Sequence, residues 1–379
     1  MNSPTAPQER NHGFDAAVKR RENDHLNRWS LAREIYGIAT TGPCEWSVRV
    51  GIYGEWGSGK TSVLEFIAAM AEKDGQTVVR FNPWQYSSKD ALWIAFISAI
   101  YNQPIFYSME RAGWVRTKKK LKWLLNQGKI VKESSAVFNE TAGKAVGAGL
   151  DIVKNWFSFT EADLAAARKK LGDKRVIVLI DDLDRTAPEL VPEILFALKE
   201  LMDIPGFSFI CAFDPVVVGT VLHQYHQGFG DGLKFLEKII DYPRWLPPAT
   251  ADNLTKLAIA ESKRFCPFVP ADSIRDAVIL LPPNPRAIRQ FIRLLNLLGP
   301  QINRYYVHEI CWPAIIAANV IKVRHPRIAP ELLSKKGFWE KISTSSYNIF
   351  LSQKSEKIET IIEEHLKNVT MLLSVTLDV

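Results

Sequence analysis

A strand-like pattern of apolar residues, a helical pattern and a second strand-like pattern follow one another in the N-terminal part of the chain. Ser47–Tyr53 alternates and is β-branched, so it predicts a short strand that runs into glycines. Ser62–Glu72 consists of helix formers, with apolar residues recurring on one side at Leu64, Ile67, Ala68 and Ala71. Gly75 ends this helix, Thr77–Phe81 predicts a second buried strand, and Ala91–Tyr101 predicts an apolar helix. This order forms a βαβ unit, which implies a parallel sheet with right-handed crossovers.

Two longer apolar runs farther along predict the central strands of the same sheet. Arg175–Ile180 and Phe207–Phe213 are almost uninterruptedly apolar, which is typical of parallel strands with both faces covered. Val191–Met202 between them predicts a helix. We therefore expect an α/β fold with a mainly parallel sheet flanked by helices. Trp84 and Trp93 are expected to be aromatic residues of its core.

The same patterns divide the chain into a core and flanking regions. Residues 1–25 are polar and predict a flexible N-terminal tail. The core is expected over residues 26–245, with a helical insert at about 102–172. Tyr242–Trp245 predicts a loop that anchors the next region. The pattern after it is helical and punctuated by prolines, which predicts a helical lid or C-terminal region over 246–379.

Composition excludes several classes of protein. The chain has 379 residues, 47% of them hydrophobic and 23% charged, so it is not a disordered polyanion, a collagen-like chain or a small disulfide-stapled scaffold. Its 4 cysteines form no Cys-x-x-Cys pair, which argues against a zinc site and a disulfide framework. We find no secretory signal and no apolar run of the roughly 20 residues needed to cross a bilayer. We therefore expect a cytoplasmic protein with no transmembrane span.

The positive charge is concentrated in one segment. Lys and Arg number 48 against 41 Asp and Glu, which gives a net charge of +7. Arg111–Lys132 contains two arginines, six lysines and no acid, so it accounts for the whole surplus. Such a segment could dock on an anionic membrane surface or on nucleic-acid phosphates. An ordinary packed helix with a solvated basic side is the alternative.

The residues after the first predicted strand fit the phosphate-loop pattern G-x-x-x-x-G-K-[ST]. Glycines let backbone N–H groups converge on phosphate oxygens, and the N-terminus of the following helix adds partial positive charge. Lys60 would reach the β- and γ-phosphates, and the hydroxyl of Thr61 would ligate Mg²⁺. A glycine-rich turn that merely precedes a helix is the alternative. The expected nucleotide-binding residues here are Gly54, Glu55, Trp56, Gly57, Ser58, Gly59, Lys60, Thr61 and Ser62.

An acidic pair follows the predicted strand at Arg175–Ile180. Asp181 would hold Mg²⁺, and Asp182 would orient or deprotonate the water that attacks the γ-phosphate. Adjacent residues at a strand end point in different directions, so the two carboxylates can have different roles. An acidic helix N-cap is the alternative interpretation, and it suits Asp184 better than Asp181.

Two further residues are candidates for reading the γ-phosphate. Asp214 directly follows a buried strand, at the carboxyl edge where open α/β sheets bind ligands. A turn residue before Pro215 is the alternative. Arg286 begins a helix in the later helical region, and its guanidinium could stabilise transition-state charge. A solvated basic face that includes Arg289 and Arg293 is the competing interpretation.

Together these motifs resemble those of the KAP family of P-loop NTPases. The segments that carry the resemblance are Gly54–Thr61, Phe81–Tyr86 (FNPWQY), Asp181–Arg185 (DDLDR), Phe213–Asp214 and Asn284–Arg286. The resemblance spans about two thirds of the chain and implies a nucleoside triphosphatase of the STAND/AAA-related group, followed by a helical region. Bacterial relatives occur in phage defence. Many relatives insert a pair of transmembrane helices between the two Walker motifs, where this chain has its basic segment.

The expected function is Mg²⁺-dependent ATP binding and hydrolysis by a switch or remodelling protein that acts with a protein partner or as a homo-oligomer. Lys60, Asp182 and Arg286 are the expected catalytic residues, and Thr61 and Asp181 the expected metal ligands. No guanine-reading N-K-x-D pattern occurs, which favours ATP over GTP. The main alternative is a nucleotide-gated scaffold that hydrolyses little ATP and recruits proteins, DNA or a membrane surface. A P-loop kinase is another, against which the long insert argues.

Overall fold

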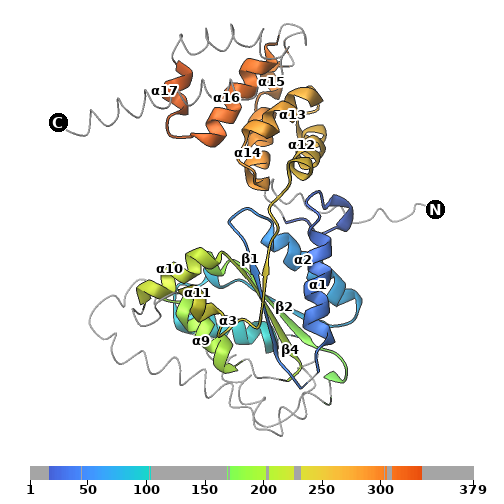
Figure 1. The fold of residues 1–379 in the computed structure, drawn as a ribbon, viewed down its shortest axis with the longest axis vertical. Helices are drawn as coiled ribbons and strands as arrows, with labels where there is room; N and C mark the ends of the chain where they lie inside the picture. The colour runs from blue at the N-terminus through green and yellow to red at the C-terminus, as the bar shows by residue number, and fades with distance from the viewer. Residues whose placement is uncertain are drawn as a thin grey trace, which may run out of the picture. The chain divides into compact units, whose positions relative to one another are not determined.

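The chain folds as two compact units. The computed structural model describes residues 17–43, 45–101, 103, 169, 171–201, 205–225, 232–302, 304 and 310–334. One unit is the α/β unit Ala17–Pro247, and the other is a helical unit whose described residues begin at Pro248 (Figure 1). The predicted basic segment Arg111–Lys132, most of the predicted insert and residues 1–16 of the predicted tail lie outside the described residues.

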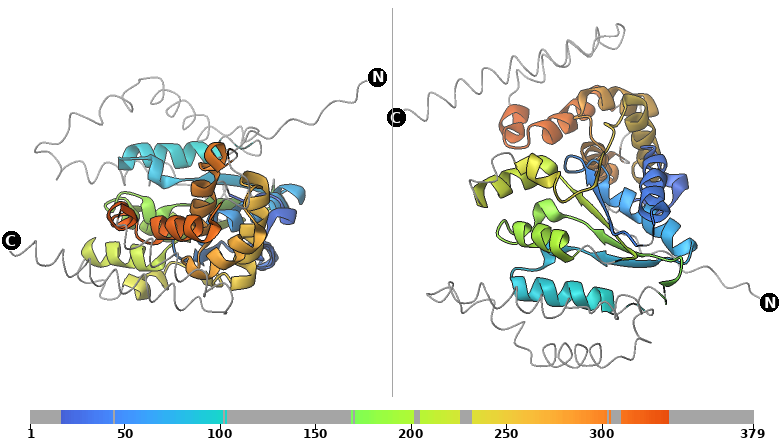
Figure 2. Two further views of the ribbon diagram at one scale, coloured as in Figure 1. Left: turned by 90° about the horizontal axis from the view of Figure 1, so that it is seen from above. Right: turned by 60° about the horizontal axis from the view of Figure 1, so that its bottom comes forward.

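The α/β unit is built on a five-stranded sheet whose strand pairs are all parallel (Figure 2). In spatial order the strands are β2 (Thr77–Phe81), β3 (Val176–Ile180), β4 (Phe207–Phe213), β1 (Val48–Tyr53) and β5 (Tyr242–Trp245). Every residue of β3 and β4 is buried, because both of their faces are covered. The predicted α/β fold with a parallel sheet and flanking helices is confirmed.

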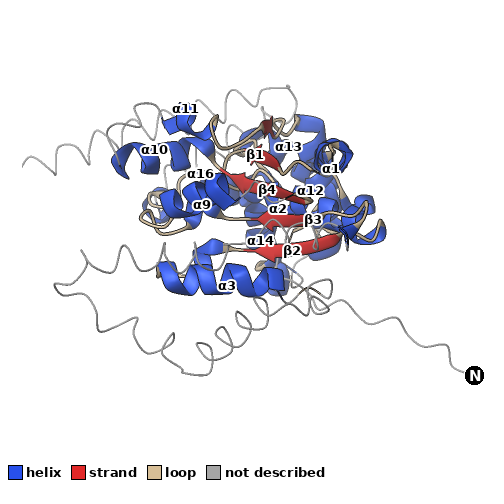
Figure 3. Cartoon of the chain, turned by 90° about the horizontal axis from the view of Figure 1, so that it is seen from below, coloured by secondary structure: helices blue, strands red, loops and turns tan. Residues whose placement is uncertain are grey.

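Helices cover both faces of this sheet (Figure 3). One face carries α1 (Arg28–Thr41) and α2 (Lys60–Lys73), and the other carries α3 (Lys89–Tyr101), α9 (Val191–Leu201), α10 (Pro215–Tyr225) and α11 (Gly232–Leu236). Within β4, Ile210 and Ala212 pack towards α1 and α2, whereas Phe209 and Cys211 pack on the opposite face. Successive side chains of a strand point to opposite faces, so each buried strand contributes to two cores.

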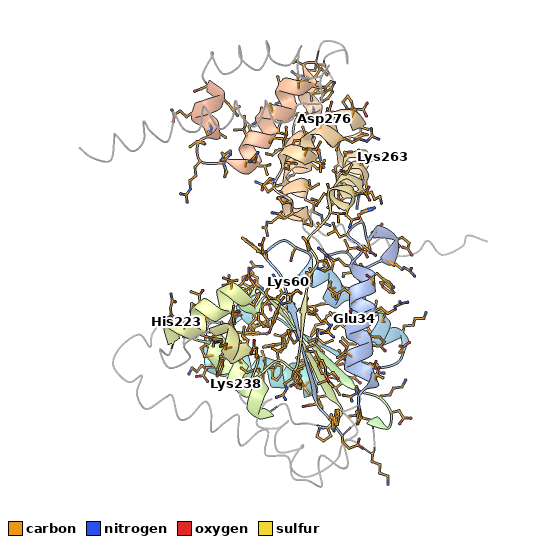
Figure 4. All side chains as sticks on the ribbon, viewed as in Figure 1. Glu34, Lys60, His223, Lys238, Lys263 and Asp276 are labelled. Carbon is orange, nitrogen blue, oxygen red and sulfur yellow. The ribbon has the colours of Figure 1, made fainter. Side chains whose placement is uncertain are left out.

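The strand β5 corrects the expectation of a loop at Tyr242–Trp245. This segment pairs in parallel with β1 at the edge of the sheet. Three of its four residues are exposed, so it lacks the apolar pattern that marks a buried strand. Pro243 is tolerated there because one side of an edge strand needs no hydrogen-bond partner. Arg244 is anchored to α1 by an ion pair of 2.8 Å between its Nε and Oε1 of Glu34, which Figure 4 labels.

The described part of the helical unit contains six helices. They are α12 (Ala251–Phe265), α13 (Ala271–Leu280), α14 (Pro285–Asn296), α15 (Gly299–Ile302), α16 (Trp312–Arg324) and α17 (Ala329–Ser334). Asn284 caps α14, because its Oδ1 accepts a hydrogen bond of 2.8 Å from the backbone N–H of Ala287. The apolar side of α14 is fully buried at Ile288, Phe291 and Leu295. None of the helices within the described ranges is long and apolar enough to cross a membrane.

Candidate functional site

The glycine-rich loop connects β1 to the N-terminus of α2, as predicted. Gly57 and Gly59 have φ angles of 82° and 102°, in the left-handed region that glycine adopts without strain. Gly54 is required for a different reason, because a Cβ at this position would lie 2.9 Å from Oγ of Ser58. The loop leads into a helix of 14 residues. This combination of tight loop and helix N-terminus is the backbone arrangement that binds phosphate groups.

Lys60 supplies a buried positive charge inside this loop (Figure 4). The residue is only 7% exposed. Its Nζ donates to the carbonyl oxygens of Gly54 at 2.8 Å and Glu55 at 3.2 Å. The same Nζ lies 3.5 Å from Oδ2 of Asp184. The ammonium group is therefore positioned where a phosphate group bound in the loop would meet it.

A second buried cation, Arg28 of α1, supports the loop. Its Nη2 donates to the carbonyl oxygen of Ser58 at 3.2 Å, and its Nη1 donates to that of Pro247 at 2.6 Å. Burial lowers the pKa of Arg28 from its ordinary value, and the charge of Asp24 partly offsets this effect. Sequence reasoning missed Arg28, because its partners are backbone carbonyls far away in the chain.

Two other residues predicted to bind the nucleotide are Trp56 in the loop and Ser62 in α2. Trp56 is 58% exposed. Oγ of Ser62 accepts a hydrogen bond of 3.0 Å from the backbone N–H of Val18. Contacts of these two residues with a nucleotide stay a prediction.

Thr61 and Asp181 meet beyond the carboxyl end of β3. The hydroxyl of Thr61 donates to the carboxylate of Asp181, whose Oδ1 also accepts from the backbone N–H of Asp182 at 2.9 Å. The pKa of Asp181 is raised to about 6, chiefly by burial and in part by the charge of Asp182, although the hydrogen bonds from Thr61 and from the backbone of Asp182 and the charge of Lys60 lower it. Carboxylate and hydroxyl oxygens are ligands that suit Mg²⁺, so Thr61 and Asp181 fit this ion.

Asp182 contacts a different set of residues from Asp181. Its backbone has a φ of 56°, in the left-handed region that is uncommon outside glycine. Its Oδ2 accepts a hydrogen bond of 3.0 Å from Nδ2 of Asn82, which follows β2. Its Oδ1 lies 3.5 Å from Nη1 of Arg185, which closes the short 3₁₀ helix η4 (Leu183–Arg185). The two neighbouring carboxylates therefore have separate partners.

The alternative interpretation, in which Asp184 is a helix N-cap, is wrong, because Asp184 lies inside η4. Its Oδ2 accepts a hydrogen bond of 3.1 Å from the backbone N–H of Asp214 and lies 3.5 Å from Nζ of Lys60. The side chain is only 7% exposed. Asp184 therefore links the glycine-rich loop to the end of β4. The signal that could have found it is the third acid of the DDLDR segment.

The expectation that Trp84 belongs to the core is also wrong, whereas Trp93 is buried as expected. Trp84 lies in the 3₁₀ helix η2 (Pro83–Gln85) and is 44% exposed. The guanidinium carbon of Arg185 lies over the ring, 4.4 Å from its centroid. Trp84 is therefore a surface residue that holds a partner of Asp182.

The roles of Asp214 and Arg286 stay predictions. Oδ1 of Asp214 accepts a hydrogen bond of 3.0 Å from the backbone N–H of Val216 and so caps α10. Arg286 lies in the first turn of α14. Its neighbour Arg289 forms an ion pair of 3.5 Å with Glu261 of α12, so the basic side of α14 also connects two helices.

Solved structures with a similar architecture include proteins of archaea. A Walker-type ATPase of Pyrococcus abyssi is 15% identical with a TM-score of 0.43, over 84% of this chain and 81% of that chain. The protein Cdc6p of Pyrobaculum aerophilum is 13% identical with a TM-score of 0.45, over 76% of this chain and 66% of that chain.

Sequence comparison identifies the family. The phage T7 exclusion protein of Escherichia coli K12 is 26% identical over 352 residues, which cover 83% of this chain and 47% of that protein. The chain thus spans about half the length of this relative. Residues 38–302 match the KAP family P-loop domain, and this match includes the glycine-rich loop, both acidic residues after β3 and Arg286. The chain therefore belongs to the KAP family of P-loop NTPases.

Proposed function

We propose that this protein binds ATP together with Mg²⁺, hydrolyses the ATP, and acts as a switch in phage exclusion. The observation that carries the proposal is the grouping of Lys60, the Thr61–Asp181 pair and Asp182 at the carboxyl edge of the sheet. The relatedness to a phage T7 exclusion protein supports the biological role. Because the chain covers about half of that relative, the activity of the whole protein is part of this proposal.

ATP binding would use the charge that the loop already contains. The backbone of the glycine-rich loop and the N-terminus of α2 would bind the phosphate oxygens. Lys60 would exchange its two neutral carbonyl acceptors for oxygens of the β- and γ-phosphates, because charge-assisted hydrogen bonds are stronger. The burial of this ammonium strengthens the attraction, since little water screens it.

Hydrolysis would depend on the carboxylates after β3. Thr61 and Asp181 would hold Mg²⁺, which offsets negative charge on the β- and γ-phosphates when it is bound. Asp182 would orient a water molecule and accept its proton while the water oxygen bonds to the γ-phosphorus and the bond to the β-phosphate oxygen breaks. We further propose that Asp214 and Arg286 contact the γ-phosphate.

Substitution of Lys60 tests this function. ATP and GTP binding by calorimetry and phosphate release would be measured with and without Mg²⁺ for the wild-type protein, Lys60→Ala and Lys73→Ala. Lys73 is the control, because it is exposed at the other end of α2. We expect preference for ATP, Mg²⁺-dependent phosphate release, and a loss of about 100-fold or more in Lys60→Ala alone. Unchanged binding and hydrolysis in Lys60→Ala would refute the assignment.

A nucleotide-gated scaffold is the second candidate function. It is favoured by the hydrogen bond from Asn82 and the ion pair with Arg185 at the two carboxylate oxygens of Asp182, since these contacts compete with a water molecule for the carboxylate. In this case phosphate release by the wild-type protein would be no faster than by Asp182→Asn, although both bind ATP. If the protein is a hydrolase, Asp182→Asn abolishes release.

The proposed biological setting has its own test. We place the protein in the cytoplasm, acting with a protein partner or a second copy of the chain, and consider Arg111–Lys132 a docking surface for nucleic acid or an anionic membrane. Expression in bacteria followed by phage plating should lower plating efficiency for the wild-type protein but not for Lys60→Ala. Equal plating for both, with both proteins present, would contradict the switch.

A further inference from the structure

Asp182 has an unfavourable backbone conformation that its surroundings must maintain. A φ of 56° and a ψ of 33° place this residue in the left-handed region. Within the described residues, only one other non-glycine residue, Asn27, has a positive φ. Such conformations persist where surrounding contacts determine them, and they cluster at functional sites. The contacts around Asp182 therefore maintain a conformation that is typical of functional sites.

The carboxylate of Asp182 is held from two sides. Nδ2 of Asn82 donates to Oδ2 at 3.0 Å, and Nη1 of Arg185 lies 3.5 Å from Oδ1. Asn82 comes from the end of β2, whereas Arg185 lies beyond the end of β3, and these two strands are paired. A hydrogen bond to one oxygen and an ion pair with the other restrict the rotation of a carboxylate more than a single contact does.

Arg185, the ion-pair partner of Asp182, is itself held by Trp84. Side chains as exposed as that of Arg185, at 42%, ordinarily change rotamers freely. Here the guanidinium lies 4.4 Å from the ring centroid of Trp84, which restricts it through a cation–π contact. Trp84 is anchored in turn, because Pro83 beside it is buried and the η2 turn is closed by a hydrogen bond of 3.1 Å from the N–H of Tyr86 to the carbonyl oxygen of Pro83.

We propose that Trp84 and Arg185 form a clamp that positions the Asp182 carboxylate for hydrolysis, with Asn82 holding its second oxygen. This inference rests on the proposed ATP hydrolysis. Arg185 is a positioning residue through its contact with Asp182, and Trp84 is a positioning residue that acts through Arg185. The clamp explains why an exposed tryptophan occurs beside the acidic pair. We expect it to contribute to turnover and not to phosphate binding, because in the described part of the chain Trp84 contacts Arg185, and Arg185 contacts Asp182 and not Lys60.

Kinetics of Trp84 variants test the clamp. Steady-state ATP hydrolysis, ATP affinity and thermal unfolding would be measured for the wild-type protein, Trp84→Leu, Trp84→Phe and Trp46→Leu. Trp46 is the matched control, because it is 60% exposed and lies before β1. We expect Trp84→Leu to lower kcat about tenfold with ATP affinity unchanged, Trp84→Phe to retain most of the activity, and Trp46→Leu to behave as the wild type.

Variants of Arg185 test the same clamp if Trp84→Leu does not fold. Arg185→Lys keeps the charge but not the planar group, and we expect it to lose kcat to the same extent as Trp84→Leu. The double variant Trp84→Leu/Arg185→Gln should be no slower than Arg185→Gln alone, since Trp84 acts through Arg185. An active wild type with full kcat in Trp84→Leu or Arg185→Lys would overturn the clamp only. A wild type no more active than Lys60→Ala would overturn the proposed function and the clamp with it.

Discussion

The two halves of the site differ in how they are built. The phosphate-binding half consists of Arg28, the loop Gly54–Gly59, Lys60 and Asp184. The side chains of Arg28, Lys60 and Asp184 are almost completely buried, whereas Glu55 and Trp56 of the loop are exposed. The water-orienting half consists of Asn82, Trp84, Asp182 and Arg185, and its Trp84 is 44% exposed. The first half is held largely by backbone carbonyls. The second half is held by side chains of two different strand ends.

This difference indicates that binding and hydrolysis are separable. A loop whose backbone carbonyls are held by the buried cations Lys60 and Arg28 binds phosphate in one geometry, and changes at the surface affect it little. The carboxylate of Asp182 is held by the half-buried Asn82 and by the exposed Arg185, so its orientation depends on each of these side chains. We therefore expect substitutions in the phosphate-binding half to change affinity and stability, and those in the water-orienting half to change turnover.

The largest expected effect is at Asp181, which interacts with Lys60 of the phosphate-binding half, with Asp182 of the water-orienting half and with Thr61. Asp181→Asn should lower Mg²⁺-dependent turnover by about 1,000-fold, because an amide replaces the charged ligand. Phosphate release over a Mg²⁺ titration measures this effect. The control is Asp173→Asn, an exposed site before β3. Turnover that stays Mg²⁺-dependent and undiminished in Asp181→Asn would remove this residue from the metal site.

The pH dependence of the free energy of unfolding tests the environment of Asp181 in a second way. The pKa of Asp181 is raised from 3.8 to about 6 in the folded protein, so its ionised form is disfavoured by folding. The free energy of unfolding should therefore fall as the pH rises from about 4 to about 6 and then level off, by at most about 3 kcal/mol from this group. Denaturant unfolding without Mg²⁺ measures it, with Asp181→Asn as reference. A constant difference between the two proteins across this range would contradict the assigned shift.

Arg28 tests whether the phosphate-binding half is fixed as a unit. Arg28→Met keeps much of the apolar bulk but leaves the carbonyl oxygens of Ser58 and Pro247 without this donor. We expect a loss of about 2 kcal/mol in the free energy of unfolding and about tenfold weaker ATP binding, with kcat reduced much less. Denaturant titration and calorimetry provide the two values. If kcat falls more than affinity, the two halves are not separable at this position.

The smallest expected effect concerns Asp184. Asp184→Asn keeps an acceptor for the N–H of Asp214 but removes the negative charge 3.5 Å from Lys60. ATP should then bind about threefold more tightly, because this carboxylate no longer attracts the ammonium or repels the phosphates. Competition with a fluorescent nucleotide resolves such a change. Weaker binding would show that Asp184 acts chiefly by orienting Lys60.

The features that can be predicted from the sequence are those that depend on a few consecutive residues. The apolar runs of β3 and β4 follow from burial on both faces, and the glycines at 57 and 59 follow from their left-handed backbone. The loop that ends in Lys60 and Thr61 and the acidic pair at Asp181 and Asp182 were predicted for the same reason, because each pattern lies within a few residues. These patterns sufficed for the family and the fold class.

The missed features depend on contacts between distant segments. Trp245 of β5 is 61% exposed, so only the pairing with β1 makes this segment a strand. Arg28 and Asp184 act through partners on other elements. Trp84 packs against the guanidinium of Arg185 at the surface and not against apolar residues of the core. The periodic pattern of apolar residues along the chain does not predict contacts between such distant segments.

The most direct measurement compares ATP affinity with single-turnover phosphate release for the wild-type protein and Asp182→Asn at saturating Mg²⁺. If the two halves are separable, Asp182→Asn binds ATP within about twofold of the wild type and releases phosphate at least about 100-fold more slowly. Loss of binding together with turnover, or unchanged phosphate release, would contradict a separate water-orienting half.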